Sequence, residues 1–280
     1  MAVVVVTDAS SRLPMDTLKE HDIRQVPLHV LVEGTDLRDG IDVLPNDIHE
    51  RAHVTTAGST PAELTDAYRQ ALADSAGDGV VAVHISAALS STLSCAVAAA
   101  RELGSDVRVV NSRSAAMGVG FVALAAARTA ARGGDLDAVE SSARAAVGRG
   151  RSFIAVHRLD NLRRSGRIGT TASWLGTALS LKPLLRLDVD GRLVLAQRIR
   201  TASKAHAALV DQVAEAVGDR RAAVAVHHVD NHDAADALGA ALTERLPQLE
   251  ALTVTDMGPV LAIHLGAGAV GVCLTLIDGD

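Results

Sequence analysis

The chain has 280 residues, a length that suggests about two domains of ordinary size. Its formal net charge of −6 provides no basic excess for nucleic-acid binding. Hydrophobic residues make up 48 % of the sequence but aromatic residues only 1 %, which argues against base-stacking sites, aromatic cages and the aromatic belts of membrane proteins.

The cysteines and the apolar stretches favour a cytoplasmic protein without stable membrane insertion. Cys95 and Cys273 form neither a disulfide framework nor a zinc-binding pattern. The N-terminal sequence MAVVVVTD has no basic segment and no long apolar run, so it does not resemble a signal peptide. The stretch 259–277 is about as long as a membrane span, but it contains His264 and three glycines. We expect a strand, a glycine-rich loop and a second buried strand there.

In the first half of the chain, strands alternate with helices, which is typical of an α/β domain. Pro27 should make its strand an edge or bulged strand. Residues 54–60 are expected to be a loop. The predicted strands are 3–6, 25–32, 79–85 and 107–110. One predicted helix begins near Pro14, and four others cover residues 61–74, 89–103, 114–131 and 136–147. A short helix is also expected at 45–52.

The pattern changes after residues 148–151, the best linker candidate. We therefore expect an N-terminal, mostly parallel α/β domain over residues 1–149 and a C-terminal, mixed-sheet α/β domain over 150–280, with a cleft between them. Asp190 and Gly191 give a strong hairpin signal between two strands, so part of the second sheet should be antiparallel. The predicted strands are 152–156, 184–188, 193–198, 222–227 and 252–255, and the helices 159–164, 202–217 and 233–245.

Hydroxyl side chains follow the strand at 79–85. Ser86, Ser90, Ser91 and Thr92 lie between this strand and a helix. Because free N–H groups and the positive end of the helix dipole point toward such a position, it suits a carboxylate or a phosphate. A single serine that merely caps the helix explains the segment equally well.

Two further segments leave similar alternatives open. The loop around Thr56 also carries hydroxyls before a helix, and its spacing alone favours an ordinary capping segment. Asp8 closes the first strand and is followed by Ser10, so it either positions a ligand or caps the next helix. His264 enters a glycine-rich turn, where backbone can approach a ligand closely.

Basic and histidine clusters support weaker hypotheses. Residues 163–167 and 198–204, the latter including Arg200, would attract an anionic group or an acidic partner, although solvated helix and strand ends are the simpler explanation. The cluster at 227–233 contains three histidines but has no HExxH-like spacing, so we expect no metal site. Nor does the sequence contain a dinucleotide-binding motif, a P-loop or a nucleophile elbow.

Taken in order, these segments resemble the DegV family of bacterial fatty-acid-binding proteins. The resemblance covers nearly the whole chain, and its strength lies in many weak motifs in register. The matching segments are VVVTDASSRLP (4–14), QVPLHVLV (25–32), GTDLRDGID (34–42), TAGSTPAEL (56–64), ISAALSST (85–92), residues 111–120, LRRSGRI (162–168), GTALSLKP (176–183), RTASKA (200–205) and HLGAGAVG (264–271).

The resemblance implies a two-domain DegV-like fold that holds one long-chain fatty acid, such as palmitate, stearate or oleate, in an apolar tunnel. Thr56 and Ser90 would hold the carboxylate, assisted by Ser86 and Ser91. His264 and Arg200 would lie close to the head group. The implied partner is a fatty acid kinase that phosphorylates the bound acid to acyl-phosphate. The carrier itself would not catalyse and would need no cofactor or metal.

Several positions depart from the family pattern and thin the hydroxyl network. Ala57 and Gly58 replace Ser and Gln, Ala87 replaces the second Ser of SSxLSGT, and Ala267 replaces the Pro of HxGPG. Two alternatives remain. The first is a phosphotransferase or hydrolase that acts on a small anionic substrate. The second is an interaction module for an acidic partner.

Overall fold

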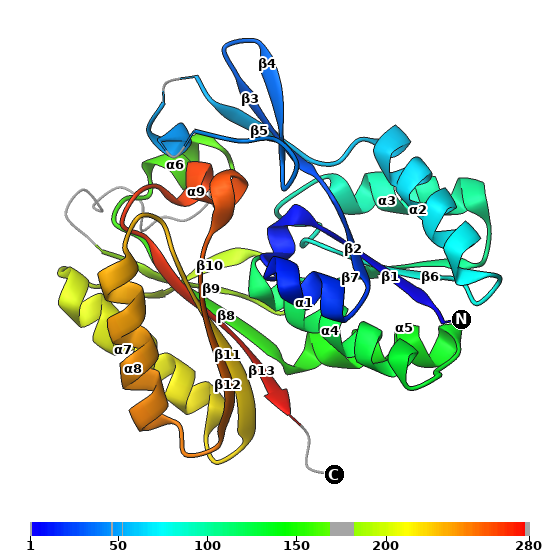
Figure 1. Cartoon of the computed structure of the whole chain (residues 1–280). Helices are drawn as coiled ribbons and strands as arrows, with labels where there is room; N and C mark the ends of the chain where they lie inside the picture. Colours follow the sequence, from blue (N-terminus) through cyan, green and yellow to red (C-terminus); the bar gives the residue numbers. More distant parts are fainter. Residues whose placement is uncertain (1, 46, 52, 169–181, 278–280) are drawn as a thin grey trace. The chain divides into compact units, whose positions relative to one another are not determined.

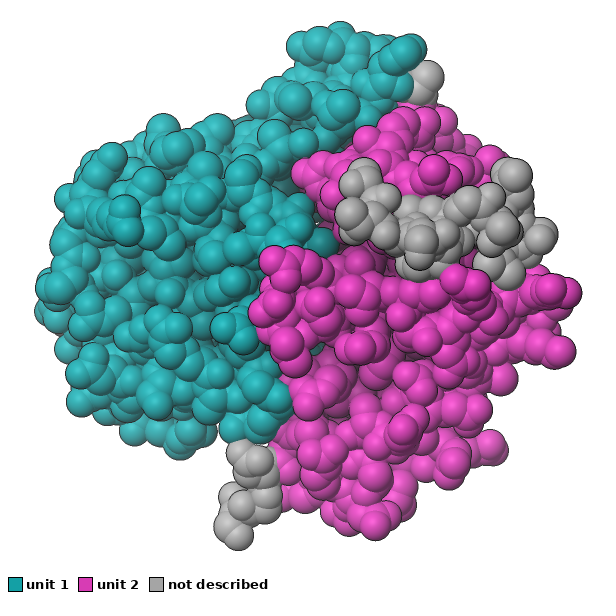
Figure 2. All heavy atoms as spheres, turned by 180° about the vertical axis from the view of Figure 1, so that it is seen from behind, with its two compact units in different colours: residues 1–44, 53–149 teal, residues 45–52, 150–280 magenta. Residues whose placement is uncertain are grey.

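The computed structural model describes the chain except residues 1, 46, 52, 169–181 and 278–280 (Figure 1). The chain forms two compact units. Unit 1 comprises Met1–Leu44 and His53–Arg149, and unit 2 comprises Pro45–Ala52 and Gly150–Asp280 (Figure 2). That residues 1–149 and 150–280 are domains stays a prediction. The segment that matches GTALSLKP lies mostly outside the described residues.

Unit 1 contains a four-stranded parallel sheet in the order β2-β1-β6-β7. Helices α2 and α3 lie on one face of this sheet, and α4 and α5 on the other (Figure 1). Because both faces are covered, the central strands are nearly continuous runs of buried valine. The strands are β1 (Val4–Asp8), β2 (Ile23–Val26), β6 (Val80–His84) and β7 (Val107–Asn111). The helices are α1 (Met15–Glu20), α2 (Pro61–Ser75), α3 (Thr92–Leu103), α4 (Met117–Ala131) and α5 (Leu136–Arg149).

A second, antiparallel sheet in unit 1 has the order β4-β3-β5. Here the prediction of one strand at 25–32 was wrong. Pro27 lacks a backbone N–H and separates β2, which belongs to the parallel sheet, from β3, which belongs to the small one. The loop expected at 54–60 contains a strand, and the short helix expected at 45–52 is only a 3-10 turn, η2 (Ile48–Glu50). The strands are β3 (Leu28–Val32), β4 (Thr35–Asp39) and β5 (Thr55–Ala57).

Unit 2 contains a mixed six-stranded sheet in the order β10-β9-β8-β13-β11-β12. Strands β11 and β12 are parallel, and the other neighbours are antiparallel. The predicted hairpin is confirmed as β9 and β10. The strands are β8 (Gly150–Ala155), β9 (Leu184–Leu187), β10 (Leu193–Gln197), β11 (Arg221–His228), β12 (Leu249–Asp256) and β13 (Val270–Ile277). The helices are α6 (Asp160–Arg164), α7 (Ala202–Val217), α8 (His232–Arg245) and α9 (Gly258–Leu265).

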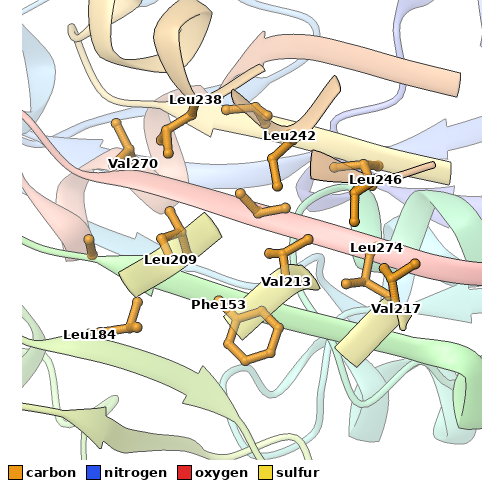
Figure 3. Close-up of a cluster of buried hydrophobic side chains, with 14 of the residues drawn as sticks. Phe153, Leu184, Leu209, Val213, Val217, Leu238, Leu242, Leu246, Val270 and Leu274 are labelled. Carbon is orange, nitrogen blue, oxygen red and sulfur yellow. The ribbon is translucent and has the colours of Figure 1, made fainter. Parts of the chain in front are cut away.

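The core of unit 2 lies between its sheet and the helices α7 and α8 (Figure 3). Leu209 and Val213 of α7 and Leu242 of α8 are fully buried against strand residues such as Leu274. This core contains Phe153, but its contacts are otherwise aliphatic. The mixed α/β fold expected from the sequence, with a parallel sheet first and a mixed sheet second, is therefore confirmed.

The stretch 259–277 differs from the prediction in its first half. Residues 259–265 belong to helix α9, with Pro259 in its first turn, rather than to a strand. The glycine-rich loop and the second, buried strand β13 are present as expected. The expected linker at 148–151 is also absent, because α5 ends at Arg149 and β8 begins at Gly150. Within the described part of the chain, no helix has the length and apolar character needed to cross a bilayer.

Candidate functional site

The carboxyl edge of the parallel sheet in unit 1 has the geometry of a ligand site. Successive strands are added outward on both sides of the β1–β6 pair, so the strand order reverses between these two parallel strands. Open α/β sheets bind ligands outside the carboxyl ends of the strands at such a switch point. Asp8 and His84 end these two strands here, and Ser86 lies two residues after His84. Asp8 also accepts a hydrogen bond from Ser10 N at 3.1 Å, so it caps the 3-10 turn η1 (Ala9–Ser11).

The segment after β6 forms a compact turn that leads into α3. Ser86 is fully buried, and its carbonyl accepts hydrogen bonds from Leu89 N at 3.0 Å and Ser90 N at 3.1 Å. Ser90 Oγ lies 2.9 Å from Thr92 Oγ1 and accepts from Thr92 N at 3.2 Å. The side chain of Ser91 makes no capping bond. Ser90 is therefore the hydroxyl that lies at the beginning of α3, and Ser86 builds the turn that holds it.

The hydroxyl loop around Thr56 lies against this turn. Thr56 pairs with Val30 in the small sheet, and Gly58 follows one residue after β5. A Cβ atom on Gly58 would lie 2.5 Å from Thr92 Oγ1 and 3.2 Å from Ser90 Oγ. Only a glycine allows the two backbones to approach so closely. The two hydroxyl loops of the sequence analysis are thus neighbours in unit 1.

A buried histidine ties the small sheet to α2. His29 Nδ1 lies 2.8 Å from Asp36 Oδ1, and His29 Nε2 lies 2.9 Å from Glu63 Oε2. Glu63 also accepts from the backbone N–H of Thr60 at 2.9 Å, which completes the capping box at the start of α2. Burial opposes a charge on His29, but the hydrogen bonds to the two carboxylates outweigh it and raise its pKa. His29 pairs with Ala57, so this cluster holds the strand that carries Thr56.

His264 and Arg200, the remaining predicted residues, belong to unit 2. His264 lies in the last turn of α9, which Gly266 terminates at φ 78°. Burial, and secondarily the nearby guanidinium of Arg167, lowers the pKa of His264 to about 4. A neutral imidazole at pH 7 offers a hydrogen bond rather than a positive charge. Arg200 is exposed immediately before Thr201, whose side chain caps α7.

The glycine-rich loop after α9 is packed against a histidine that sequence reasoning missed. A Cβ atom on Gly268 would lie 2.4 Å from the ring of His157, and Gly268 has φ +80°. Asn231 Nδ2 donates to Gly268 O at 3.0 Å and fixes this loop. Burial, together with the charge of Lys182, lowers the pKa of His157. The only feature of the sequence that could have indicated His157 is its position directly after the predicted strand 152–156.

The histidine cluster at 227–233 does not have the arrangement of a metal centre. The rings of His228 and His232 lie 4.0 Å apart between centroids. Among the described residues, however, no group of three or more histidine, cysteine or acidic side chains is placed to hold a metal ion. Burial lowers the pKa of His228. Within the described part of the chain, this cluster therefore offers no metal site to the phosphotransferase or hydrolase alternative.

A hollow of about 310 Å³ lies at the opposite, amino-terminal edge of β1 in unit 1. Five of its lining residues are ionisable, which does not suit an acyl chain. The acyl tunnel implied by the family resemblance therefore stays a prediction. The ionisable lining residues are Glu20, His21, Asp22, Arg24 and Asp74.

Comparisons with known proteins agree with this architecture. The family model "Uncharacterised protein, DegV family" matches residues 2–276. A DegV domain-containing protein of Mycobacterium tuberculosis is 64 % identical over 98 % of this chain and 97 % of its own length. A structure from Thermus thermophilus, reported as showing fatty acid binding of a DegV family protein, has a TM-score of 0.92 at 32 % identity and covers 99 % of this chain and 100 % of that one. DegV from Bacillus subtilis, reported as a fatty acid binding protein, has a TM-score of 0.88 at 26 % identity over 99 % of this chain and 100 % of its own. The chain therefore belongs to the DegV family.

Proposed function

We propose that the protein binds one long-chain fatty acid and holds its carboxylate with Thr56 and Ser90 at the beginning of α3. The observation that carries this proposal is the close approach of Gly58 to Ser90 and Thr92, which brings the two hydroxyl loops together at the carboxyl edge of the sheet. Hydroxyl donors at a helix N-terminus suit a carboxylate. The fatty acid binding reported for the T. thermophilus and B. subtilis relatives supports the choice of ligand.

The rest of the ligand is hydrophobic, and its burial provides most of the affinity. Each buried methylene contributes about 0.8 kcal/mol, so a chain of about 16 carbons contributes on the order of 12 kcal/mol before the costs of binding. Aliphatic side chains suffice for such contacts, which fits a chain with 1 % aromatic residues. Palmitate, stearate and oleate are the expected ligands. His264, as a neutral hydrogen-bonding group, and Arg200 lie near the head group in this proposal.

The protein serves as a carrier rather than a catalyst in this proposal, and it presents the bound acid to a fatty acid kinase that forms acyl-phosphate. No cofactor or metal is needed for this role. The free thiols Cys95 and Cys273 fit the reducing cytoplasm, where we place the protein. A coupled assay tests the partner: kinase, ATP and the loaded protein should yield acyl-phosphate, whereas the loaded protein with ATP alone should not. ATP turnover by the protein alone would contradict the carrier role.

Binding of palmitate to the delipidated protein tests the carboxylate site. Thr56→Val keeps the shape of the side chain and removes one hydroxyl. Ser90→Ala removes the other. A hydrogen bond to a charged group contributes about 1.5–3 kcal/mol, so each variant should bind palmitate about 10- to 150-fold more weakly.

Ser94→Ala is the matched control for these two variants. Its hydroxyl also lies in the first turns of α3, but it donates to Ser91 O at 2.7 Å and is exposed. Its palmitate affinity should equal that of the wild type. Unchanged affinity in both Thr56→Val and Ser90→Ala would refute the proposed site.

A further inference from the structure

Three buried polar side chains form a chain of hydrogen bonds beneath the Ser90 turn. They are Asp8 at the end of β1, His84 at the end of β6, and Tyr68 in α2, and each is fully buried. Side chains alternate between the two faces of a strand, so Asp8 shares a face with the buried Val4 and Val6. His84 shares the same face on β6. That face packs on α2, where Tyr68 lies in the same hydrophobic core.

The carboxylate of Asp8 is hydrogen-bonded to three residues, Ser10, His84 and Ile85. Its Oδ2 atom lies 3.0 Å from His84 Nδ1 and accepts from Ile85 N at 2.9 Å. Its Oδ1 atom accepts from Ser10 N at 3.1 Å and from the Ser10 hydroxyl. The other ring nitrogen of His84 lies 2.6 Å from the hydroxyl of Tyr68. Every polar atom of the three side chains therefore has a partner.

The direction of the hydrogen bonds follows from these partners. Burial raises the pKa of Tyr68, so its phenol keeps its proton and donates to His84 Nε2. His84 then carries its proton on Nδ1 and donates to Asp8. The loss of one member would leave a buried polar atom unpaired, which is costly in a site of low dielectric constant.

This network ends at the turn that holds Ser90. Asp8 fixes the backbone N–H of Ile85, the residue directly before Ser86. Ser86 N donates to Ser114 O at 2.8 Å, and the Ser86 carbonyl accepts from Ser90 N at 3.1 Å. One hydrogen-bonded turn thus separates the Asp8 carboxylate from Ser90. Apolar side chains would fill the same space, so a polar network here points to control of geometry rather than to packing alone.

We propose that Asp8, His84 and Tyr68 are positioning residues that hold the Ser90 turn in the geometry that binds a carboxylate. This inference rests on the proposed fatty-acid function. The Tyr68 hydroxyl orients His84, His84 orients Asp8, and Asp8 fixes the backbone at Ile85. None of the three contacts the ligand, and each acts through the position of Ser90.

The test compares two ligands with the same alkyl chain, palmitate and hexadecanol, of which only palmitate has a carboxylate. Tyr68→Phe removes one oxygen atom, and Asp8→Asn replaces one acceptor oxygen by an amide. We expect both variants to weaken palmitate binding about tenfold, the smaller end of the effect that hydrogen-bond partners of metal ligands have on metal affinity, and to leave hexadecanol binding unchanged. Circular dichroism verifies that each variant is folded, and Tyr68→Phe decides the question if Asp8→Asn does not fold.

Thr7→Val is the matched control. Thr7 Oγ1 donates to Val83 O at 2.9 Å. This buried hydrogen bond also joins β1 to β6, but it does not reach the turn that holds Ser90. Thr7→Val should lower the melting temperature and leave the ratio of the two affinities unchanged. Equal weakening of both ligands in Tyr68→Phe, or no weakening, would overturn the positioning role while wild-type protein still binds palmitate. Wild-type protein that binds no palmitate would instead refute the proposed function.

Discussion

Substitution of Gly58 by alanine tests the close approach of the two hydroxyl loops. The new methyl group would lie 2.5 Å from Thr92 Oγ1 and 3.0 Å from Thr92 N. Ordinary van der Waals contact begins at 3.4 Å, so the first pair of atoms must separate by about 0.9 Å, the difference between these distances. Rotation of the Thr92 side chain would relieve the clash only at the cost of its hydrogen bond with Ser90, because Thr92 is fully buried and its hydroxyl lies 2.9 Å from Ser90 Oγ.

The expected consequences are a loss of ligand affinity and a loss of folding stability that are similar in free energy. Overpacking of this kind costs about 1–3 kcal/mol. If the loops separate, Thr56 and Ser90 no longer reach the same carboxylate, and the loss of one charged hydrogen bond weakens palmitate binding about 10- to 150-fold. Isothermal titration calorimetry with delipidated protein measures this change.

Gly148→Ala provides the matched control for this substitution. Gly148 lies in α5, and a Cβ atom there would meet nothing within 4 Å. Because alanine has the higher helix propensity, the control should be as stable as the wild type or more stable by up to about 1 kcal/mol. Its palmitate affinity should not change. A Gly58→Ala protein with wild-type affinity would refute the reasoning about the two loops.

Three further predictions follow from the histidines and from a second glycine. The pKa of His29 is raised, so the stability that this residue adds is fully present below its unfolded pKa of about 6.5 and is lost as the pH rises through the folded value. Urea unfolding at pH 6 and pH 9 should therefore show a larger fall in stability for the wild type than for His29→Gln, and parallel falls would contradict this. The pKa of His264 is about 4, so the stability that this residue adds is present above about pH 6.5 and is lost as the pH falls toward 4. The NMR signals of its imidazole should not titrate between pH 5.5 and 8. A titration midpoint near pH 6.5 would contradict the burial of this side chain. Gly268→Ala adds a clash with His157 to backbone strain, whereas Gly218→Ala, at φ +58° and in open space, adds only strain. The melting temperature should fall further for Gly268→Ala than for Gly218→Ala. Equal falls would show that the ring of His157 can move aside without cost.

The sequence predicted most helices, and most strands of the parallel sheet and of the mixed sheet, because their apolar periods are regular. It failed where one local pattern fits two structures. The run 25–32 alternates like a single strand, and only the tertiary fold shows that Pro27 separates strands of two sheets. Residues 259–265 are apolar throughout, and such a run does not distinguish a buried strand from the buried helix α9.

For the candidate site, the sequence identified the residue types but not all of their partners. The hydroxyls at Thr56 and Ser90 were predicted by motif, and the close approach of the two loops that carry them became visible only through Gly58. Asp8 was left open between a ligand and a cap, and the structure shows the cap together with its bond to His84. The link to Tyr68 joins residues that are far apart in the chain, so no local spacing indicates it.

Native mass spectrometry of the gently purified protein tests the central claim most directly. We expect one long-chain fatty acid bound per chain, released on denaturation and identified as palmitate, stearate, oleate or a close relative. The delipidated protein should take up one equivalent of palmitate and return to the same mass. A protein that is purified without lipid and takes up no fatty acid would contradict the account.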